Sequence, residues 1–585
     1  MPHLQFKGKS AVETYHHTVP HHTLQFDKKL SVLDKGQSPA LDGNLIIEGD
    51  NLLALKALLP THAGKVKCIY IDPPYNTGEE QWVYNDKLTQ PQFKEWIGQT
   101  VGKEGEDFCR HDKWCCMMYP RLQLLKELLR EDGIIFISID DIELSHLRMM
   151  MNEIFGEDNF IANVVWRKKI SPDARQDIDP THEYVMTFAK SSKTLATQGS
   201  FGITPLSEKR KASFKNPDND LRGPWASVDM TGMSGRATKD QYFPVTLPSG
   251  RVVRPPSGRS WGLAQATFKQ LLADNRIWFG KSGDGVPRTK QFLAENKGQN
   301  SASWWPEDQS GTTESATKLL AAILGKPGVF DFPKPLELIS RLVSIINDPS
   351  AIVLDSFAGS GTTAHAVLNL NDIDNGSRKF ILVQMPHDSK KDEKDKTNIA
   401  QKLTAVRVRR VIRGYKVSKK AKNGGDNVPG LGGTFTYTRL SEAPLFGDYR
   451  DLGDKLPGYD EIAAYVYYTE TSTQWSGSDR RKNKAFDKKI GRIGEYPPEG
   501  PPEYPQEGPR AAPGNRRSYY LLYQPNAKLD AGLDAEFLKK VAAKDPNREL
   551  VVYCEKLWVH REHLRAWERE HGKRIRPMIV PFNLK

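Results

Sequence analysis

The chain has 585 residues, of which 38% are hydrophobic and 27% are charged. It is long enough for several domains and too apolar for wholesale disorder. No apolar run approaches the length of a membrane span, and we expect no secretory signal, because no charged segment followed by an apolar core is visible. The five cysteines form no C-x-x-C pair, which argues against a disulfide framework and a zinc site. We therefore expect a protein of the reducing cytoplasm.

The net charge of +12 permits a polyanionic partner, but the distribution of the charge is more informative. Residues 191–300 hold 17 Lys and Arg against 8 Asp and Glu, together with Trp225, Trp261 and Trp278. Cations bind phosphates and flat rings stack on bases, so this stretch has the composition of a nucleic-acid surface. A solvated basic face is the alternative that composition alone leaves open.

The first part of the chain changes from irregular to regular at Leu45. Residues 1–44 are polar, and nothing nearby completes a metal-ligand set for their histidines. We therefore expect these side chains at the surface: His16, His17, His21 and His22. Beyond Leu45, strands are predicted at 45–47, 66–71 and 134–139, and helices at 52–59 and 119–130. This alternation predicts a largely parallel α/β sheet with helices on both faces.

The alternation stops in residues 191–310, a stretch rich in Gly, Pro, Ser and basic residues, which we interpret as an inserted domain. It resumes with a predicted helix at 335–346, a strand at 352–354, a helix from about Thr363 and a strand at 380–384. The proline-rich segment 494–517 predicts a stiff, exposed linker, and residues 518–585 predict a small mixed domain.

The motif Asp72-Pro73-Pro74-Tyr75 stands at the carboxyl end of the predicted strand 66–71, where open α/β sheets bind their ligands. Proline has no N–H but keeps its carbonyl, so the loop offers a carboxylate, a bare Pro73 carbonyl and an aromatic ring. Two acceptors and a flat surface suit the exocyclic amine of a heterocycle. They would hold its two N–H groups and leave the nitrogen lone pair to attack an electrophile. A sharp Pro-Pro turn with a satisfied Asp72 is the alternative.

A second motif, Asp355-Ser356-Phe357-Ala358-Gly359-Ser360-Gly361-Thr362-Thr363, follows the predicted strand 352–354 and opens a helix. Its glycines would let a ligand approach the backbone at a helix N-terminus, as in the loose dinucleotide fingerprint. No lysine follows Gly361, so the motif is not a Walker phosphate loop. The next strand ends in Gln384 rather than in an acidic residue, which weakens the dinucleotide interpretation.

Together the two motifs resemble the β-class adenine-specific DNA methyltransferases, in which D-P-P-Y precedes F-x-G-x-G and a target-recognition segment lies between them. Within that group the chain is similar to the modification (Mod) subunit of type III restriction-modification systems over nearly its whole length. The segments that carry the likeness are 45–52, 71–78, 136–141, 276–280, 332–335 and 355–363, and more faintly 519–523 and 581–582.

The resemblance implies a Rossmann-like S-adenosylmethionine-dependent methyltransferase fold, a mostly parallel doubly wound α/β sheet with an inserted target-recognition domain and a small C-terminal α+β domain. It divides the chain into an N-terminal segment (1–44), a catalytic half (45–190), the recognition domain (191–310), a cofactor-binding half (311–390), a basic helical accessory region (391–493), a linker (494–517) and a C-terminal domain (518–585).

The resemblance also implies roles for particular residues. Asp72, Pro73, Pro74 and Tyr75 would bind and activate a flipped-out adenine in double-stranded DNA for methylation at N6. The S-adenosylmethionine pocket would be formed by Asp50, Phe332, Lys334, Asp355, Phe357, Ala358, Gly359, Gly361, Thr362 and Gln384. Candidate DNA-binding residues are Arg251, Arg254, Arg259, Trp261, Lys281, Arg288 and Lys290. A homodimer, a separate helicase-nuclease restriction partner, a place at the prokaryotic nucleoid and no metal are further implications.

Several alternatives stay open at this point. N4-cytosine methylation uses the same amine chemistry, although its motif more often has Ser in place of Asp72. A related N-P-P-Y loop modifies RNA or protein glutamine, and the long basic insert fits duplex DNA better. A catalytically silent DNA-binding specificity subunit is possible in principle, but the intact motifs argue against it. Glu295-Asn296-Lys297 with Asp284 upstream is only faintly similar to a metal-nuclease pattern. Cytosine-C5 chemistry is disfavoured, because no Pro-Cys occurs.

Overall fold

The computed structural model describes residues 3–77, 110–175, 177–198, 201–204, 206, 208–296, 298–387, 397–417, 425, 427–442, 444–445, 458–471, 475, 491–496, 517–523 and 532–579. Within these residues, none of the helices combines the length and the apolar character that a membrane span requires.

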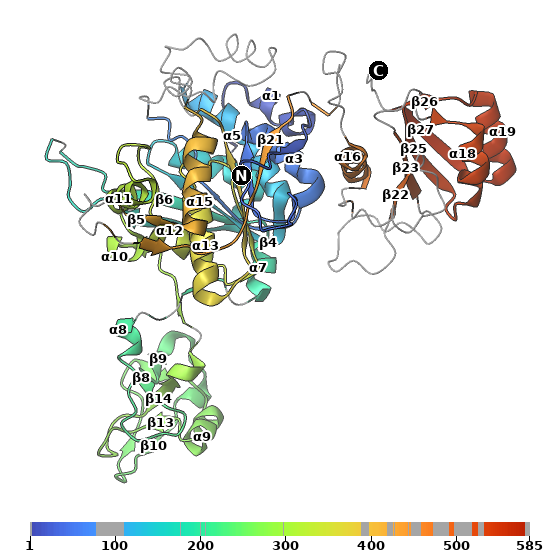
Figure 1. Cartoon of the computed structure of the whole chain (residues 1–585). Coiled ribbons are helices and arrows are strands. Elements are labelled where there is room, and N and C mark those ends of the chain that lie inside the picture. The colour runs from blue at the N-terminus through green and yellow to red at the C-terminus, as the bar shows by residue number, and fades with distance from the viewer. Residues whose placement is uncertain are drawn as a thin grey trace. The chain divides into compact units, whose positions relative to one another are not determined.

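A ten-stranded sheet forms the centre of the largest part of the chain (Figure 1), in the order β1-β21-β2-β18-β17-β3-β4-β6-β5-β16. The strands are β1 (Leu24–Phe26), β2 (Leu45–Glu48), β3 (Val66–Ile71), β4 (Leu129–Ile139), β5 (Phe160–Arg167), β6 (His182–Ala189), β16 (Trp304–Trp305), β17 (Ile352–Asp355), β18 (Lys379–Gln384) and β21 (Thr436–Leu440). The run from β21 to β4 is parallel, whereas β6 is antiparallel to β4. The mostly parallel sheet predicted from the sequence is therefore confirmed.

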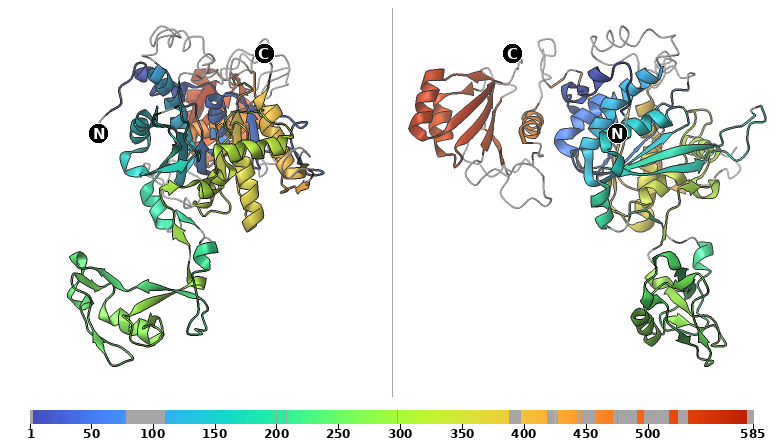
Figure 2. Two further views of the ribbon diagram at one scale, coloured as in Figure 1. Left: turned by 90° about the vertical axis from the view of Figure 1, so that its left-hand side faces the viewer. Right: turned by 180° about the vertical axis from the view of Figure 1, so that it is seen from behind.

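Helices cover both faces of this sheet (Figures 1 and 2). One hydrophobic core lies beneath α3 (Asn51–His62), α5 (Arg110–Leu128) and α6 (Leu144–Phe155). The other lies beneath α11 (Thr313–Leu324), α12 (Leu336–Ser344), α13 (Thr362–Asp374) and α15 (Ala405–Arg413). Central strands buried on both sides read as continuous apolar runs, which is why the sequence reveals them.

The central strand β3 shows what such burial demands. All six of its residues are buried, including Lys67. The Lys67 ammonium lies 2.8 Å from Asp132 Oδ2 and 2.8 Å from the Asp132 carbonyl, so the buried charge is paired. Asp132 itself lies inside β4. This strand begins at Leu129 rather than at residue 134 as predicted, and a bulge interrupts its pairing with β3. The helix predicted at 119–130 is longer than expected and ends before this strand, at Leu128.

The expectation of surface histidines near the N-terminus is wrong for three of the four. This segment forms α1 (Lys9–Val12), α2 (Tyr15–Thr18) and β1, and its buried residues include His16, His21 and His22. Burial lowers the pKa of His16 to about 4 and that of His21 to about 3, so both rings are neutral. The segment packs onto the domain because β1 pairs with β21.

The segment 391–493 also differs from the expected helical accessory region. It contributes α15 and α16 (Tyr459–Thr471), but its strand β21 joins the main sheet beside β2. Part of this segment therefore completes the ten-stranded sheet. β21 is only five residues long, and two adjacent polar residues, Thr438 and Arg439, interrupt its alternation of polar and apolar residues, so periodicity gave no clear strand signal.

Residues Gly202–Ser301 form a separate compact unit, within the expected insert 191–310. Its sheet consists of β13 (Ile277–Trp278), β14 (Arg288–Phe292) and β8 (Trp225–Asp229), and β9 (Thr231–Met233) pairs with β12 (Arg259–Trp261). Helix α9 (Gln265–Ala273) supplies Phe268 to a small hydrophobic core around Trp261. The insert is therefore a folded module, not a solvated loop.

Close to the C-terminus a second sheet has the order β22-β23-β25-β27. Its strands are β22 (Gly491–Tyr496), β23 (Arg517–Leu522), β25 (Glu549–Cys554) and β27 (Arg574–Ile579), accompanied by α18 (Ala535–Lys540) and α19 (Arg561–His571). Most of the predicted proline-rich linker, residues 497–516, lies outside the described residues.

Candidate active site

The two sequence motifs meet at one edge of the main sheet. β3 and β17 are neighbouring parallel strands, with Cys68 opposite Val353 and Ile69 opposite Leu354. The loop that begins at Asp72 and the turn that begins after Asp355 therefore leave the sheet at the same edge. Had these loops been at opposite ends, one methyl group could not pass between ligands bound at them. The arrangement required by the sequence interpretation is present.

Asp72 is the centre of a network of charged and polar side chains. The Lys334 ammonium donates to both of its carboxylate oxygens, at 2.8 Å each. The Tyr75 hydroxyl lies 3.0 Å from Asp72 Oδ1 and 3.2 Å from Glu183 Oε2. The Lys168 ammonium is 3.2 Å from the other oxygen of Glu183. Two carboxylates and two ammonium groups thus balance one another around the Tyr75 hydroxyl.

Burial sets the ionisation of this network. Desolvation raises the pKa of Asp72, against the opposing influence of Lys334, while Glu183 adds to the rise. Desolvation alone would lower the pKa of Lys334, but the adjacent Asp72 and Glu183 carboxylates raise it, so the amine stays an ammonium. The pKa of Tyr75 is raised by desolvation and by the same two carboxylates, so its hydroxyl stays neutral. A neutral Tyr75 ring next to an anionic acceptor suits a flat, amine-bearing ligand.

The two prolines of the loop present their carbonyls differently. The Pro74 carbonyl accepts a hydrogen bond from Trp114 Nε1 at 2.7 Å, which fixes the loop to α5. Among the described residues no group donates to the Pro73 carbonyl, which leaves it as the acceptor expected from the sequence. Pro73 therefore remains a candidate ligand-binding group, whereas Pro74 supports the loop.

A buried carboxylate binds the residue that follows the Asp72-Pro73-Pro74-Tyr75 loop. Asn76 has a left-handed backbone (φ 63°), and its amide donates to Glu143. Glu143 also accepts from His111 Nδ1 at 2.7 Å and from His146 Nδ1 at 2.8 Å, and its side chain is fully buried. These separations are hydrogen-bond distances, shorter than the roughly 3.3 Å between ligand atoms that share a tetrahedral metal ion at about 2.0–2.1 Å. The cluster braces the Asp72 loop.

The glycine turn after β17 is organised by Asp355 and Gln384. Asp355 accepts from the Phe357 amide at 3.1 Å and from the Thr363 hydroxyl at 2.5 Å. Desolvation raises the pKa of Asp355 to about 7. The Gln384 amide oxygen accepts from the Gly359 N–H at 2.6 Å, and its nitrogen donates to the Met385 carbonyl at 3.2 Å. Gln384 thus braces the turn, a role the sequence did not suggest.

Both glycines of the turn have backbones that side chains disfavour: φ is 48° at Gly359 and 80° at Gly361. A Cβ on Gly361 would also lie 3.3 Å from Thr404 Cγ2. Because Gly361 is the N-cap of α13, the turn delivers the helix N-terminus, with its N–H donors, to the edge of the sheet. Phe357 and Ala358 in the same turn are buried.

A buried arginine supports the glycine turn from α15. Arg407 Nη1 donates to Ser360 Oγ at 2.8 Å and to Thr362 Oγ1 at 2.7 Å. No acidic side chain in the described part of the chain pairs with it, and burial lowers its pKa to about 10. The Thr362 hydroxyl is also 3.3 Å from the Lys334 carbonyl. Arg407 therefore supports both the turn and the segment that carries Lys334.

Two further residues were predicted to bind the cofactor, Asp50 and Phe332. Asp50 caps α3 by accepting from the Leu52 and Leu53 amides, and its other oxygen is 3.4 Å from Arg121. Its neighbour Asn51 donates to the Ser356 carbonyl at 2.9 Å, which joins α3 to the glycine turn. Phe332 is 79% exposed and has a left-handed backbone (φ 51°), an unusual state for a bulky residue and one that indicates a functional constraint.

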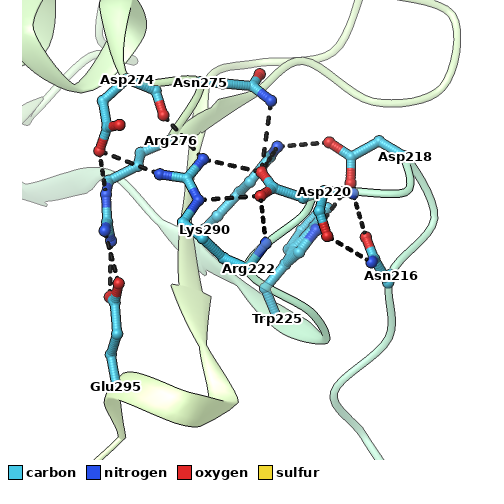
Figure 3. A network of polar contacts seen from close by, with 10 residues as sticks. All are labelled: Asn216, Asp218, Asp220, Arg222, Trp225, Asp274, Asn275, Arg276, Lys290 and Glu295. Carbon is cyan, nitrogen blue, oxygen red and sulfur yellow. Dashed lines mark hydrogen bonds and ion pairs between the residues drawn. The ribbon is translucent and has the colours of Figure 1, made fainter.

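The residues predicted to contact DNA are not equivalent within the unit 202–301. Trp261 and Lys290 are buried, so the prediction that they contact DNA is wrong. Trp261 Nε1 donates to the Phe243 carbonyl at 2.8 Å, and Lys290 lies between Asp218 and Asp220 (Figure 3). The other candidates keep exposed or half-exposed side chains: Arg251, Arg254, Arg259, Lys281 and Arg288.

Ion pairs within this unit reduce the positive charge that is available to bind phosphates. Arg222 and Arg276 form ion pairs with Asp220, Asp274 and Glu295 (Figure 3). Arg251 is 2.9 Å from Asp284. Glu295 and Asp284, the acidic residues of the faint nuclease pattern, are thus both paired with arginines, while Lys297 lies outside the described residues.

The sequence interpretation missed Glu183, Arg407 and Glu143. Each lies in or directly before an element that the sequence did not single out, and each reaches the site through a contact between residues distant in the chain. A signal existed only for Glu183, a charged residue at the start of an otherwise apolar strand. Arg407 lies in a strongly basic helix, where one buried arginine looks like its solvated neighbours.

Comparison with known proteins gives consistent findings. A family model described as DNA methylase matches residues 66–388. The chain is 37% identical over 352 residues to the StyLTI Mod subunit of a type III restriction-modification enzyme from Salmonella typhimurium, across 58% of this chain and 52% of that protein. It is 31% identical over 475 residues to the EcoPI Mod subunit of Escherichia phage P1, across 74% of this chain and 71% of that protein. The chain therefore spans about half the length of the first relative.

Among solved structures, the complex of M1.HpyAVI with S-adenosylmethionine aligns with 60% of this chain and 99% of that chain. The sequence identity is 16% and the TM-score 0.25.

Proposed function

Because the chain belongs to the DNA methylase family, we propose that it transfers the methyl group of S-adenosylmethionine to the N6 amine of an adenine in double-stranded DNA. Its similarity to type III Mod subunits supports site-specific methylation as the modification component of a restriction-modification system. The observation that carries the proposal is the meeting of the Asp72 loop and the glycine turn at one edge of the sheet.

The residues at this edge fit the cofactor that the family uses. When bound, S-adenosylmethionine supplies an electrophilic methyl group on a sulfonium. The glycine turn offers backbone without side chains, and Ser356 Oγ is buried with no hydrogen-bond partner among the described residues. The exposed ring of Phe332 and the carboxylates of Asp50 and Asp355 complement a ligand with an adenine ring and a positive charge. The residues proposed to hold it are Asp50, Phe332, Asp355, Phe357, Ala358, Gly359, Gly361 and Thr362.

The residues of the Asp72 loop would prepare the amine. The Asp72 carboxylate and the Pro73 carbonyl accept its two N–H groups, and Tyr75 stacks on the base. With both hydrogens held, the nitrogen lone pair would be oriented toward the methyl group that the cofactor would supply. The excess proton on the nitrogen passes to Asp72. Most of the acceleration comes from alignment and from preorganised dipoles.

An adenine inside a duplex must first leave the base stack. Flipping costs a few kcal/mol of stacking and pairing. Stacking on an aromatic side chain returns roughly 1–3 kcal/mol. We propose that Tyr75 provides this stacking and that exposed cations of the unit 202–301 bind the flanking phosphates, with Arg251, Arg254, Arg259, Lys281 and Arg288 as candidates.

Partners and location follow from the same proposal. A type III modification subunit would act as a homodimer and would require a separate helicase-nuclease subunit for cleavage. We propose that it acts on DNA in the cytoplasm, at the nucleoid of a prokaryote.

The direct test is transfer of tritiated methyl groups from labelled cofactor to unmethylated DNA, followed by nucleoside analysis. N6-methyladenine is the expected product. N4-methylcytosine would instead support the rival amine methylase, and absence of label in DNA would support a silent specificity subunit. Sequencing of modified bases in a host that carries the protein identifies the recognition site.

A further inference from the structure

The Lys334 ammonium occupies the hydrogen-bonding positions that the proposed function gives to the target amine. It donates to both oxygens of Asp72, and it lies 5.0 Å from the centre of the Tyr75 ring, on which the base would stack. An ammonium and an exocyclic amine are both N–H donors, so they compete for Asp72. A positive charge at this position also opposes the charge that develops on the nitrogen as the methyl group arrives.

A second carboxylate lies next to this ammonium. Glu183 Oε2 is 3.7 Å from Lys334 Nζ, too far for a hydrogen bond, whereas Asp72 is at 2.8 Å. A shift of roughly 1 Å would convert this contact into a charge-assisted hydrogen bond. Lys334 has a side-chain exposure of only 12%, so leaving Asp72 without gaining another anion would be costly. Glu183 is the acceptor within reach.

The surroundings keep Glu183 ready for this role. Lys168 binds its other oxygen at 3.2 Å, and the Tyr75 hydroxyl bridges its Oε2 and Asp72. The Tyr75 ring therefore stays oriented when the ammonium moves from one carboxylate to the other. Glu183 comes from β6 and Asp72 from the loop after β3, and β4 lies between these strands in the sheet.

We propose that Glu183 is a positioning residue of the methyl-transfer site, which receives the Lys334 ammonium when the amine of the target base binds Asp72. This inference rests on the proposed function and names one further residue for it. Lys334 then alternates between two carboxylates. The Asp72 oxygens become free to accept hydrogen bonds only when a base with an amine is present. Glu183 acts through Lys334 and contacts neither cofactor nor base.

The test is a double-mutant cycle of Glu183→Gln and Lys334→Met, measured as single-turnover transfer of tritiated methyl groups to unmodified host DNA. Glutamine has the size of Glu183 and can still accept a hydrogen bond from Tyr75. It carries no negative charge, so it cannot pair with the Lys334 ammonium. We expect E183Q to slow transfer about tenfold or more, and to slow it less than about twofold in the K334M background. The dissociation constant for the cofactor should stay within about twofold of the parent.

A binding measurement complements the rates. Duplexes with adenine or with purine, which lacks the amine, are compared at the target position identified by modified-base sequencing. The parent should prefer adenine, and E183Q should lose most of that preference. Glu307→Gln is the matched control, because Glu307 pairs with Arg167 of β5, and it should leave transfer unchanged.

The outcomes separate the two proposals. Parent-like transfer by E183Q, or an equal loss from E183Q with and without Lys334, would overturn the role of Glu183 while leaving the methylase intact. A parent protein that methylates no DNA would overturn the proposed function itself.

Discussion

Lys334 donates to both carboxylate oxygens of Asp72 at 2.8 Å, although the two residues are 262 positions apart in the chain. The compact unit 202–301 is inserted between them in sequence. The parallel pairing of β3 with β17 brings the halves together on either side of that insertion. The cofactor half therefore supplies not only the glycine turn but also the cation that pairs with the proposed catalytic carboxylate.

Replacing Asp72 with alanine should nearly abolish methyl transfer and leave cofactor binding largely intact. The amine would lose the acceptor that orients it, and the rate should fall by about 100- to 1,000-fold. Single-turnover tritium transfer measures the loss, and calorimetric titration measures cofactor affinity. Asp141→Ala is the control, because Asp141 lies just after the neighbouring strand and accepts only from Tyr184 among the described residues. Unchanged turnover in D72A would remove Asp72 from the mechanism.

Much of this site could be predicted from local sequence. The strands around Ile69 and Leu354 are apolar runs buried on both faces, and each motif directly follows such a run. The roles of Glu183 and Arg407 could not be found in this way, because they depend on contacts with residues distant in the chain; the local pattern marked only the unusual charge of Glu183. Lys290 was predicted to contact DNA for a similar reason, since composition counts charged residues without showing which of them are paired.

Arg407→Met should weaken cofactor binding without changing DNA binding. The guanidinium holds Ser360 and Thr362 in place, so its loss should loosen the turn that forms the proposed pocket. We expect the dissociation constant for S-adenosylmethionine to rise about tenfold, as for loss of one hydrogen-bonded charged group. Arg409→Met is the control, because Arg409 lies on the same helix and donates to the Leu30 carbonyl instead. Equal cofactor affinity in R407M and R409M would contradict the bracing role.

Asp355→Asn should change how the stability of the protein depends on pH. Burial raises the pKa of Asp355 from 3.8 to about 7, so the native state binds this proton more tightly than the unfolded state. The contribution of Asp355 to the free energy of unfolding therefore falls as pH rises between these values, by up to about 4 kcal/mol. Asparagine cannot titrate, so D355N should show a weaker decline from pH 4 to 7 in denaturant unfolding. Identical pH profiles for the parent and D355N would refute the raised pKa.

Neutralising Arg251, Arg254 and Arg259 with glutamine should weaken DNA binding and flatten its salt dependence. Each lost phosphate contact lowers the slope of log K against log salt by about 0.9. Fluorescence anisotropy with duplex DNA at several salt concentrations provides the measurement. The pairing of Arg251 with Asp284 predicts a smaller effect for R251Q alone than for R254Q alone. Salt-insensitive binding by the parent protein would argue against this surface as a phosphate-binding face.

Lys290→Met should impair DNA binding by a different route, through the folding of the unit 202–301. The Lys290 ammonium is buried between Asp218 and Asp220, and Asp220 also holds Arg222 and the Asn275 amide (Figure 3). Removing the cation leaves two carboxylates short of a partner, which costs about 3–5 kcal/mol for a buried pair. K290M should therefore unfold this unit at lower temperature, visible as earlier proteolytic cleavage within residues 202–301.

The exposed Lys281→Met variant is the control for K290M, and it should leave the stability of the unit unchanged. Below the unfolding temperature, K290M should keep the salt slope of the parent, because a buried ammonium meets no phosphate. The combination of a parent-like stability and a reduced salt slope in K290M would show that Lys290 contacts DNA after all. The ion pairs of Lys290 with Asp218 and Asp220 would then have to break when DNA binds.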